Sequence, residues 1–245
     1  MGAIWSWFLG VIFAVLQFFY GWTHDYGFAI ILLTLVFRLV LMPLTSKQTK
    51  SMYELQAIQP KIKALQEKYK NDKEKQQAEL MKFYQDNKVN PFGGCLPLLL
   101  QMPLFIALIG VLGGTTEKPG NLLAYLIAHP TVSRAFWIIL PDITKTPQAV
   151  YVAAAKAGVL AGIWAALPYL VFVALFGLSI WLPQYLMTKD PMQRRTGSIM
   201  AIVMLYIGFI YPAGVLIYWV TSSGWQVVQQ VLMQRKLERA KGAEA

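Results

Sequence analysis

The chain has little that could carry out chemistry. Its 245 residues include one cysteine, Cys95, and two histidines, His24 and His129. A single cysteine excludes a disulfide within the chain and a thiolate metal cluster, and two histidines leave little for a metal site. We therefore expect no metal and no cofactor. Cys95 is interpreted as a small apolar residue rather than a nucleophile, because no His or Asp accompanies it.

Charged residues are also scarce. They make up 14% of the chain, whereas 56% of the residues are apolar. This composition is too apolar for a soluble domain and is typical of a membrane protein with several spans. The first seven residues contain no Lys or Arg, so the basic region of a cleavable signal peptide is missing.

Sequence motifs of common catalysts are missing too. There is no His-Glu-x-x-His, no Gly-Lys-Ser/Thr phosphate loop and no pair of carboxylates in the apolar segments. Gly177-Leu-Ser179 is present, but both histidines lie in connections, which disfavours an intramembrane serine protease. An ion-coupled carrier normally has an Asp or Glu in its spans. We therefore expect that the protein is not an enzyme.

The apolar segments predict an all-α membrane protein with five transmembrane helices, since a crossing takes about 20 apolar residues. The run from 198 to 232 is too long for one crossing and is broken at Tyr211-Pro212, a turn signal. The first span is expected to end near Pro43. The predicted spans are 26–44, 92–113, 167–187, 198–211 and 214–232. The segment 114–166 connects two of them and is expected to contain short helices at 121–128 and 149–165.

Lysine and arginine are unevenly distributed between the two sides of this topology. Segments 46–91, 188–196 and the C-terminal tail contain seventeen of them and fall on one side, whereas the other side has four. Cytoplasmic loops carry the excess of basic residues. The N-terminus is therefore predicted outside and the C-terminus in the cytoplasm. The four on the outer side are Lys118, Arg134, Lys145 and Lys156.

Residues 1–24 are open to two interpretations. Residues 3–22 could span the membrane, and a sixth crossing would leave the remaining topology unchanged. A narrow polar stripe at helical spacing, with tryptophans suited to an interface, favours an amphipathic helix lying on the outer face. The stripe consists of Ser6, Gly10, Ala14, Gln17 and Gly21.

The basic segment 46–90 predicts a cytoplasmic helical hairpin. Apolar residues recur at spacings of three and four on a helix otherwise rich in Lys, Gln and Glu. Asn71-Asp72 breaks the pattern, and a second helix follows. The seam could close on itself, or it could be a docking surface for a client or a targeting factor. It consists of Leu55, Ile58, Ile62, Leu65 and Tyr69.

Arg38 is the most informative residue, because it lies inside an otherwise uncharged span. Such a charge costs roughly 2.5–3.5 kcal/mol on insertion scales. Thr34 precedes it by four residues and shares its helical face. Arg38 alone could snorkel to the boundary, but further polar residues on other spans favour a shared wet cavity. These residues are Gln101, Gln184, Thr221, Ser222 and Ser223.

Several stretches together resemble the YidC-type membrane protein insertases over residues 25–235. The most specific of them is the block Asn90-Pro-Phe-Gly-Gly-Cys-Leu-Pro97, because its residues occur in this order. The stretches are Gly27-Phe-Ala-Ile-Ile-Leu-Leu-Thr-Leu-Val-Phe-Arg38-Leu-Val-Leu-Met-Pro43-Leu-Thr, Gln59-Pro-Lys-Ile, Val89-Asn-Pro-Phe-Gly-Gly-Cys-Leu-Pro-Leu-Leu-Leu-Gln-Met-Pro103, Asp190-Pro-Met-Gln193, and Tyr211-Pro-Ala-Gly-Val-Leu-Ile-Tyr-Trp219 with Gln229-Gln230.

The resemblance implies five core helices around a hydrophilic groove that is open to the cytoplasm and to lipid and closed on the outside. Arg38 matches the groove arginine of the family, Thr34 a position on the same helix, and Gln184 and Trp219 further groove positions. The implied function is insertion and folding of client transmembrane segments at the bacterial plasma membrane, although an internal photosynthetic membrane stays open. The alternative is a small anion channel or carrier that binds its solute at Arg38.

The resemblance also implies partners and departures. Nascent membrane proteins and lipids are the expected partners, with a ribosome, a targeting factor and a Sec translocon as further candidates and no direct recognition of nucleic acid. Residues 25–235 form the expected core and 236–245 a short basic tail. A large soluble outer domain and a long ribosome-binding tail have no counterpart in the sequence. Residues 149–165 resemble an insertion.

Overall fold

The computed structural model describes residues 2–87, 89, 96–113, 120–187 and 191–243, and the regular elements in these residues are helices. They form two compact units. Unit 1 comprises Met1–Leu39 and Leu104–Val227, and unit 2 comprises Val40–Pro103 and Val228–Ala245. Two long helices, α2 (Tyr26–Lys68) and α9 (Ala213–Ala243), contribute residues to both units.

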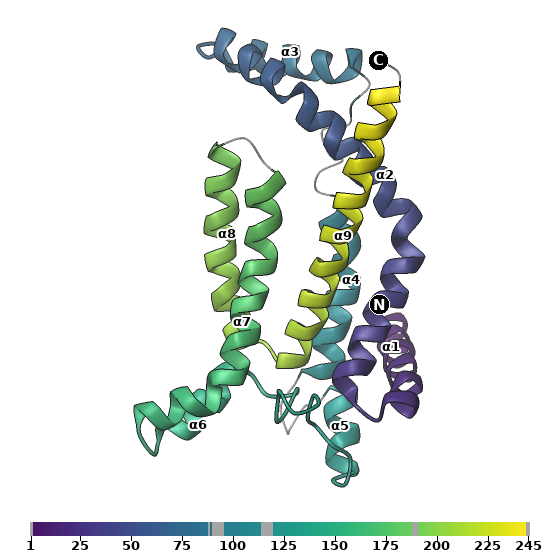
Figure 1. Ribbon diagram of the computed structural model, residues 1–245, viewed down its shortest axis with the longest axis vertical. Coiled ribbons are helices and arrows are strands. Elements are labelled where there is room, and N and C mark those ends of the chain that lie inside the picture. Colours follow the sequence, from purple (N-terminus) through teal and green to yellow (C-terminus); the bar gives the residue numbers. More distant parts are fainter. Residues whose placement is uncertain (1, 88, 90–95, 114–119, 188–190, 244–245) are drawn as a thin grey trace. The chain divides into compact units, whose positions relative to one another are not determined.

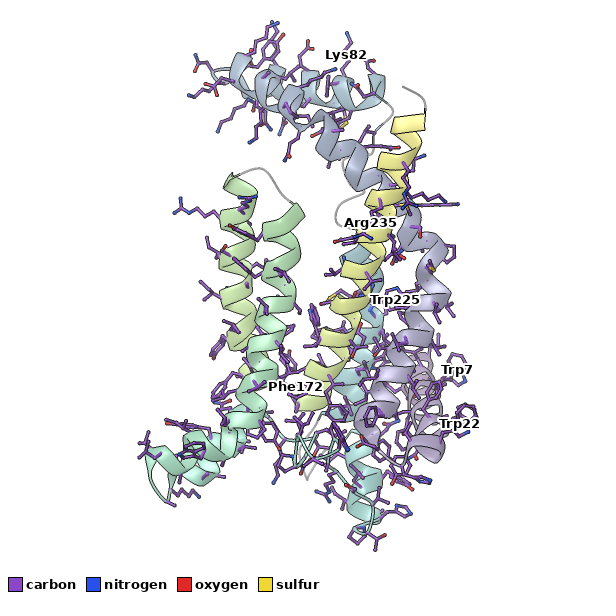
Figure 2. All side chains as sticks on the ribbon, viewed as in Figure 1. Trp7, Trp22, Lys82, Phe172, Trp225 and Arg235 are labelled. Atoms are coloured by element: carbon purple, nitrogen blue, oxygen red, sulfur yellow. The ribbon has the colours of Figure 1, made fainter. Side chains whose placement is uncertain are left out.

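Unit 1 is a helical bundle around one apolar core. The first part of α2 and the first part of α9 supply many of its buried residues, including Tyr26, Ile30 and Tyr218. Phe172 of α7 joins this core, and Figure 2 labels it. The other helices of the unit are α1 (Gly2–Thr23), most of α4 (Leu96–Leu112), α5 (Asn121–Ala128), α6 (Pro147–Ala155), α7 (Val159–Met187) and α8 (Pro191–Ile210).

Asp25 determines where α2 begins. One carboxylate oxygen accepts hydrogen bonds from the backbone N–H groups of Gly27 (2.7 Å) and Phe28 (3.2 Å). These donors have no partner inside the helix, so the aspartate acts as an N-cap. The chain turns from α1 into α2 at His24, which has a positive φ of 53°.

Helices α7 and α8 lie side by side (Figure 1) because small residues let their backbones approach. A Cβ atom at Gly177 of α7 would collide with the side chain of Leu205 on α8. A Cβ atom at Gly208 of α8 would lie 2.8 Å from Phe176 of α7. Small residues at helix contacts are typical of membrane proteins, and the outer faces of both helices remain apolar and exposed.

Unit 2 contains the predicted hairpin. Helix α2 ends at Lys68, and α3 (Lys73–Asp86) begins after Asp72, whose side chain accepts a hydrogen bond from the backbone N–H of Lys75. The break predicted at Asn71-Asp72 is therefore confirmed. The two arms lie next to each other, as Figure 1 shows, and the side-chain amide of Gln76 donates to the carbonyl of Gln66 at 2.6 Å.

Three stretches in the described part of the chain are long and apolar enough to cross a membrane: Ala3–Thr23, Tyr26–Ser51 and Val159–Leu182. A shorter apolar helix covers Gln101–Leu112. Helices α8 and α9 lie where spans were predicted, but Arg194-Arg195 and the polar residues around Ser222 lower their mean hydropathy. Length and composition also permit α1 to cross, so both interpretations of residues 1–24 remain.

One predicted boundary needs a correction, and one helix is longer than the span predicted within it. Helix α2 continues through Pro43 and Pro60, so the first predicted span and the first arm of the hairpin belong to one helix. A proline inside a helix removes one backbone donor, and the neighbouring residues keep their helical bonds. The single helix expected at 149–165 is wrong, because α6 ends at Ala155 and α7 begins at Val159. Gly158 between them has a φ of +130°, which an α-helix cannot accommodate.

Other boundaries agree with the predictions. Helix α5 covers Asn121–Ala128 as expected, and the turn at Tyr211-Pro212 separates α8 from α9. Cys95, interpreted above as a small apolar residue, lies outside the described residues.

Candidate functional site

The candidate site lies in unit 1, where Arg38 of α2 meets Ser222 of α9. The guanidinium Nε donates a hydrogen bond of 2.9 Å to the Ser222 hydroxyl oxygen, and Nη2 donates to the same oxygen. Ser222 is completely buried, and the arginine is only 7% exposed. The side chain therefore turns toward α9 and is covered by protein, whereas snorkelling would extend it along the helix toward the membrane boundary.

The Ser222 hydroxyl that accepts from Arg38 is neutral. A hydroxyl accepts hydrogen bonds but brings no charge to balance the guanidinium. In the sequence, α4, α7 and α8 contain no Asp or Glu, and the first acid of α9 is Glu238. A cation held by a hydroxyl in apolar surroundings still attracts an anion strongly, because a low local dielectric screens charges poorly.

The other predicted residues of unit 1 take different roles. Thr34 is fully buried, and its hydroxyl donates to the carbonyl of Ile30 at 2.6 Å, within its own helix. Trp219 precedes Ser222 by less than one turn and packs edge-on against Phe105 of α4 and Phe176 of α7, with ring centroids 4.8 and 5.2 Å apart. This cluster holds three helices together next to the arginine contact.

Ser223 and the predicted residues of unit 2 complete the set. Ser223 is half-buried on α9, and Gln101 is half-buried near the start of α4. The side chain of Gln184 lies outside the described part of α7. In the hairpin seam, Ile62 is buried, whereas Leu55, Ile58, Leu65 and Tyr69 are half-buried. The Lys75 ammonium lies over the Tyr69 ring at 5.6 Å, so part of the seam faces the second arm.

Unit 2 contains a buried polar group that sequence reasoning missed. The side-chain amide nitrogen of Gln229 donates to the hydroxyls of Thr45 (2.8 Å) and Ser46 (3.1 Å). Thr45 and Gln229 are 184 residues apart, as are Arg38 and Ser222. Thr45 lies seven residues after Arg38 on α2, and Gln229 lies seven residues after Ser222 on α9, which is the heptad spacing of paired helices. That spacing was the signal that could have found it.

In unit 1, the connection before α6 closes off the starts of α2 and α9. The backbone N–H groups of Ala213 and Gly214 donate to the carbonyls of Lys145 (3.0 Å) and Ile143 (2.9 Å). Tyr169 of α7 exchanges two hydrogen bonds with the backbone of Asp142. Ile143 is fully buried. Backbone groups at the start of α9 are thereby satisfied without water.

No group of three or more His, Cys, Asp or Glu that could hold a metal ion occurs among the described residues. The arrangement offers a cation, hydroxyls and amides, and so suits binding of a polar or acidic group rather than bond cleavage.

Comparison with known proteins assigns a family to this geometry. The pattern of the 60Kd inner membrane protein family matches residues 18–241. A relative from Cellvibrio japonicus, described as membrane protein insertase YidC, is 34% identical over 96% of this chain and 37% of its own length. Relatives with the same description from Pseudoalteromonas atlantica and Wolinella succinogenes are 36% and 34% identical over 97% and 96% of this chain and 38% of their own lengths.

The chain thus spans less than two fifths of the length of these relatives. A solved structure described as an active YidC insertase with the first transmembrane domain resolved covers 92% of this chain and 46% of that chain, with a TM-score of 0.65 and 28% identity. The protein is thus a multi-pass membrane protein, and it belongs to the 60Kd inner membrane protein family, the family of the YidC-type membrane insertases.

Proposed function

We propose that this chain is a membrane protein insertase and chaperone, which captures a polar tail of a client at Arg38 and releases the client's apolar segment into lipid. The observation that carries the proposal is the buried cation of a membrane-spanning helix held by the neutral hydroxyl of Ser222. No bond is made or broken in this function, so it requires no catalytic group.

The Arg38–Ser222 contact would be the resting state. The low exposure of Arg38 argues against a guanidinium that is already open to water. A carboxylate in the client tail would replace the serine hydroxyl, because it brings the opposite charge and can accept two parallel hydrogen bonds from the guanidinium. Once the tail has moved on, Ser222 would take its place again. A replaceable neutral partner thus permits both capture and release.

Capture would shorten the unfavourable part of the client's path. Unpaired backbone groups cost several kcal/mol each in hydrocarbon. Polar residues near Arg38, including Ser223, would replace water for part of this path. The membrane potential then favours outward movement of each negative charge by about 2.3 kcal/mol per 100 mV, and burial of the apolar segment in lipid completes the transfer.

The proposed topology has five core spans with the N-terminus outside and the C-terminus in the cytoplasm. The basic hairpin of α2 and α3 would then face the cytoplasm, where it would meet anionic lipid, a nascent chain or a targeting factor. A ribosome and a Sec translocon are further proposed partners. The closed starts of α2 and α9 would face outside, which matches a groove without an outer exit.

The experiment is insertion of a single-span client with an acidic tail into liposomes that contain the purified protein. Arg38→Ala should reduce insertion about tenfold or more, whereas Arg38→Lys should retain most of it, because an ammonium keeps the charge. A client with a neutral tail is the matched control and should depend less on Arg38. Equal insertion by Arg38→Ala and the unsubstituted protein would refute the proposed role.

The same liposomes test the anion-channel alternative. A channel needs a continuous path that opens on both sides of the membrane. The fully buried Ile143 and the backbone hydrogen bond at Gly214 disfavour such a path at the start of α9. We expect no flux of a small anion such as chloride beyond that of protein-free liposomes. Flux that Arg38→Ala abolishes would favour the channel.

A further inference from the structure

A short turn in unit 1 exposes three consecutive apolar side chains. Trp137, Ile138 and Ile139 are 63%, 86% and 41% exposed, whereas Phe136 and Leu140 on either side are buried. We call residues 137–139 the apolar tip. A tip with two such large exposed residues and no charge would be costly in water.

The backbone of the apolar tip is fixed rather than loose. Phe136 donates to the Leu140 carbonyl at 2.8 Å, and Leu140 donates back at 3.2 Å. Trp137 has a φ of +45°, a left-handed conformation that a bulky residue rarely adopts. Such strain persists only where the surroundings impose it, and it is concentrated at functional positions.

Asp25 attaches this turn to the start of α2. Its second carboxylate oxygen accepts a hydrogen bond of 2.6 Å from the backbone N–H of Trp137, while the first oxygen caps α2. Asp25 directly precedes Tyr26, the first residue of the stretch Tyr26–Ser51 that can cross the membrane. The tip is therefore held at the level where a span begins.

A second exposed tryptophan lies near the same boundary. Trp22 is 72% exposed at the end of the apolar stretch Ala3–Thr23, three residues before Asp25, and Figure 2 shows it pointing away from the bundle. Tryptophan is enriched where hydrocarbon meets the headgroups. Asp25 thus has one tryptophan close to it along the chain and another attached through a hydrogen bond.

We propose that the apolar tip is a lipid anchor, which inserts Trp137 and Ile138 into the headgroup region of the bilayer and holds the start of α2 at a fixed depth. The partner is the lipid surface itself, because the tip is uncharged, lies at a span boundary and is joined to that span through Asp25. This role is independent of client capture at Arg38 and concerns a part of unit 1 that the proposed function does not use.

The test measures the depth of the tip in liposomes of phosphatidylcholine and phosphatidylglycerol. Ile138→Cys carries a nitroxide spin label in a Cys95→Ser background, and its collisions with oxygen and with a water-soluble nickel chelate are compared. The matched control is the label at Thr131→Cys, an exposed residue of the same connection. We expect a ratio of oxygen to nickel collisions at least threefold higher at 138 than at 131.

Two results would overturn the proposal. Equal ratios at 138 and 131 would place the tip in water, and low collision rates with both reagents at 138 would mean that protein covers it. A second variant, Trp137→Gly, accommodates the positive φ without strain and so keeps the fold. We expect the oxygen-to-nickel ratio at 138 to fall toward that at 131 in this variant, and an unchanged ratio would remove Trp137 from the anchor.

Discussion

Replacing Ser222 by alanine tests the central contact directly. The substitution removes the acceptor of two hydrogen bonds from the Arg38 guanidinium and leaves that charge buried. Hydrogen bonds to charged groups contribute about 1.5–3 kcal/mol, and the two donors share one oxygen. We expect a loss of about 2 kcal/mol in the free energy of unfolding, which corresponds to about a 30-fold change in the folding equilibrium.

The assay is equilibrium unfolding in mixed micelles, with Ser223→Ala as the matched control. Ser223 is the next residue of α9 and is half-buried, so its substitution should change the free energy of unfolding by less than about 0.5 kcal/mol. The same two substitutions are then made in an Arg38→Ala background. If the contact is the cause, Ser222→Ala should lose most of its effect there, because the two residues form one interaction.

Two outcomes would contradict this reasoning. Equal effects of Ser222→Ala and Ser223→Ala would mean that the hydrogen bonds to Arg38 contribute nothing to stability. Strict additivity of Ser222→Ala and Arg38→Ala would mean that the serine acts through other neighbours.

Three further substitutions test the packing and the closed end of unit 1. Gly214→Ala should destabilise the fold by about 1–3 kcal/mol, because the new Cβ would lie 3.0 Å from the Leu112 side chain. Gly224→Ala, where the new Cβ meets open space, should stabilise α9 by about 0.5–1 kcal/mol. Thermal unfolding distinguishes the two signs. Asp25→Ala should lower the free energy of unfolding by about 2 kcal/mol, because it removes both the cap of α2 and the hydrogen bond to Trp137. Limited proteolysis of the connection between residues 129 and 146 should become faster. An unchanged cleavage rate would show that the hydrogen bond does not hold the connection.

Helix boundaries followed from the sequence where a residue acts locally. Asp72 caps α3, and the Tyr211-Pro212 turn separates two helices, because capping and proline chemistry depend only on adjacent residues. The predicted end of the first span near Pro43 does not coincide with a helix end. Proline removes a single donor, and whether the helix continues depends on packing along its other residues.

The site was predicted in part. The cost of a charge in an apolar run singled out Arg38, and the spacing of four singled out Thr34, since both depend on the sequence alone. Thr34, however, bonds to its own helix. The sequence also did not anticipate Gln48 of unit 2, which is 5% exposed and whose side-chain amide has no hydrogen-bond partner among the described residues. Burial of a polar side chain depends on which elements cover it.

The amino-acid order by itself determined that the chain is helical, enters the membrane and carries one cation inside a span, because hydropathy, charge and turn chemistry are properties of neighbouring residues. The tertiary structure alone decided that this cation meets the hydroxyl of Ser222, 184 residues away, and that Asp25 joins the start of α2 to Trp137. Contacts of such sequence separation depend on how helices pack, and packing is decided by the shapes of many side chains together.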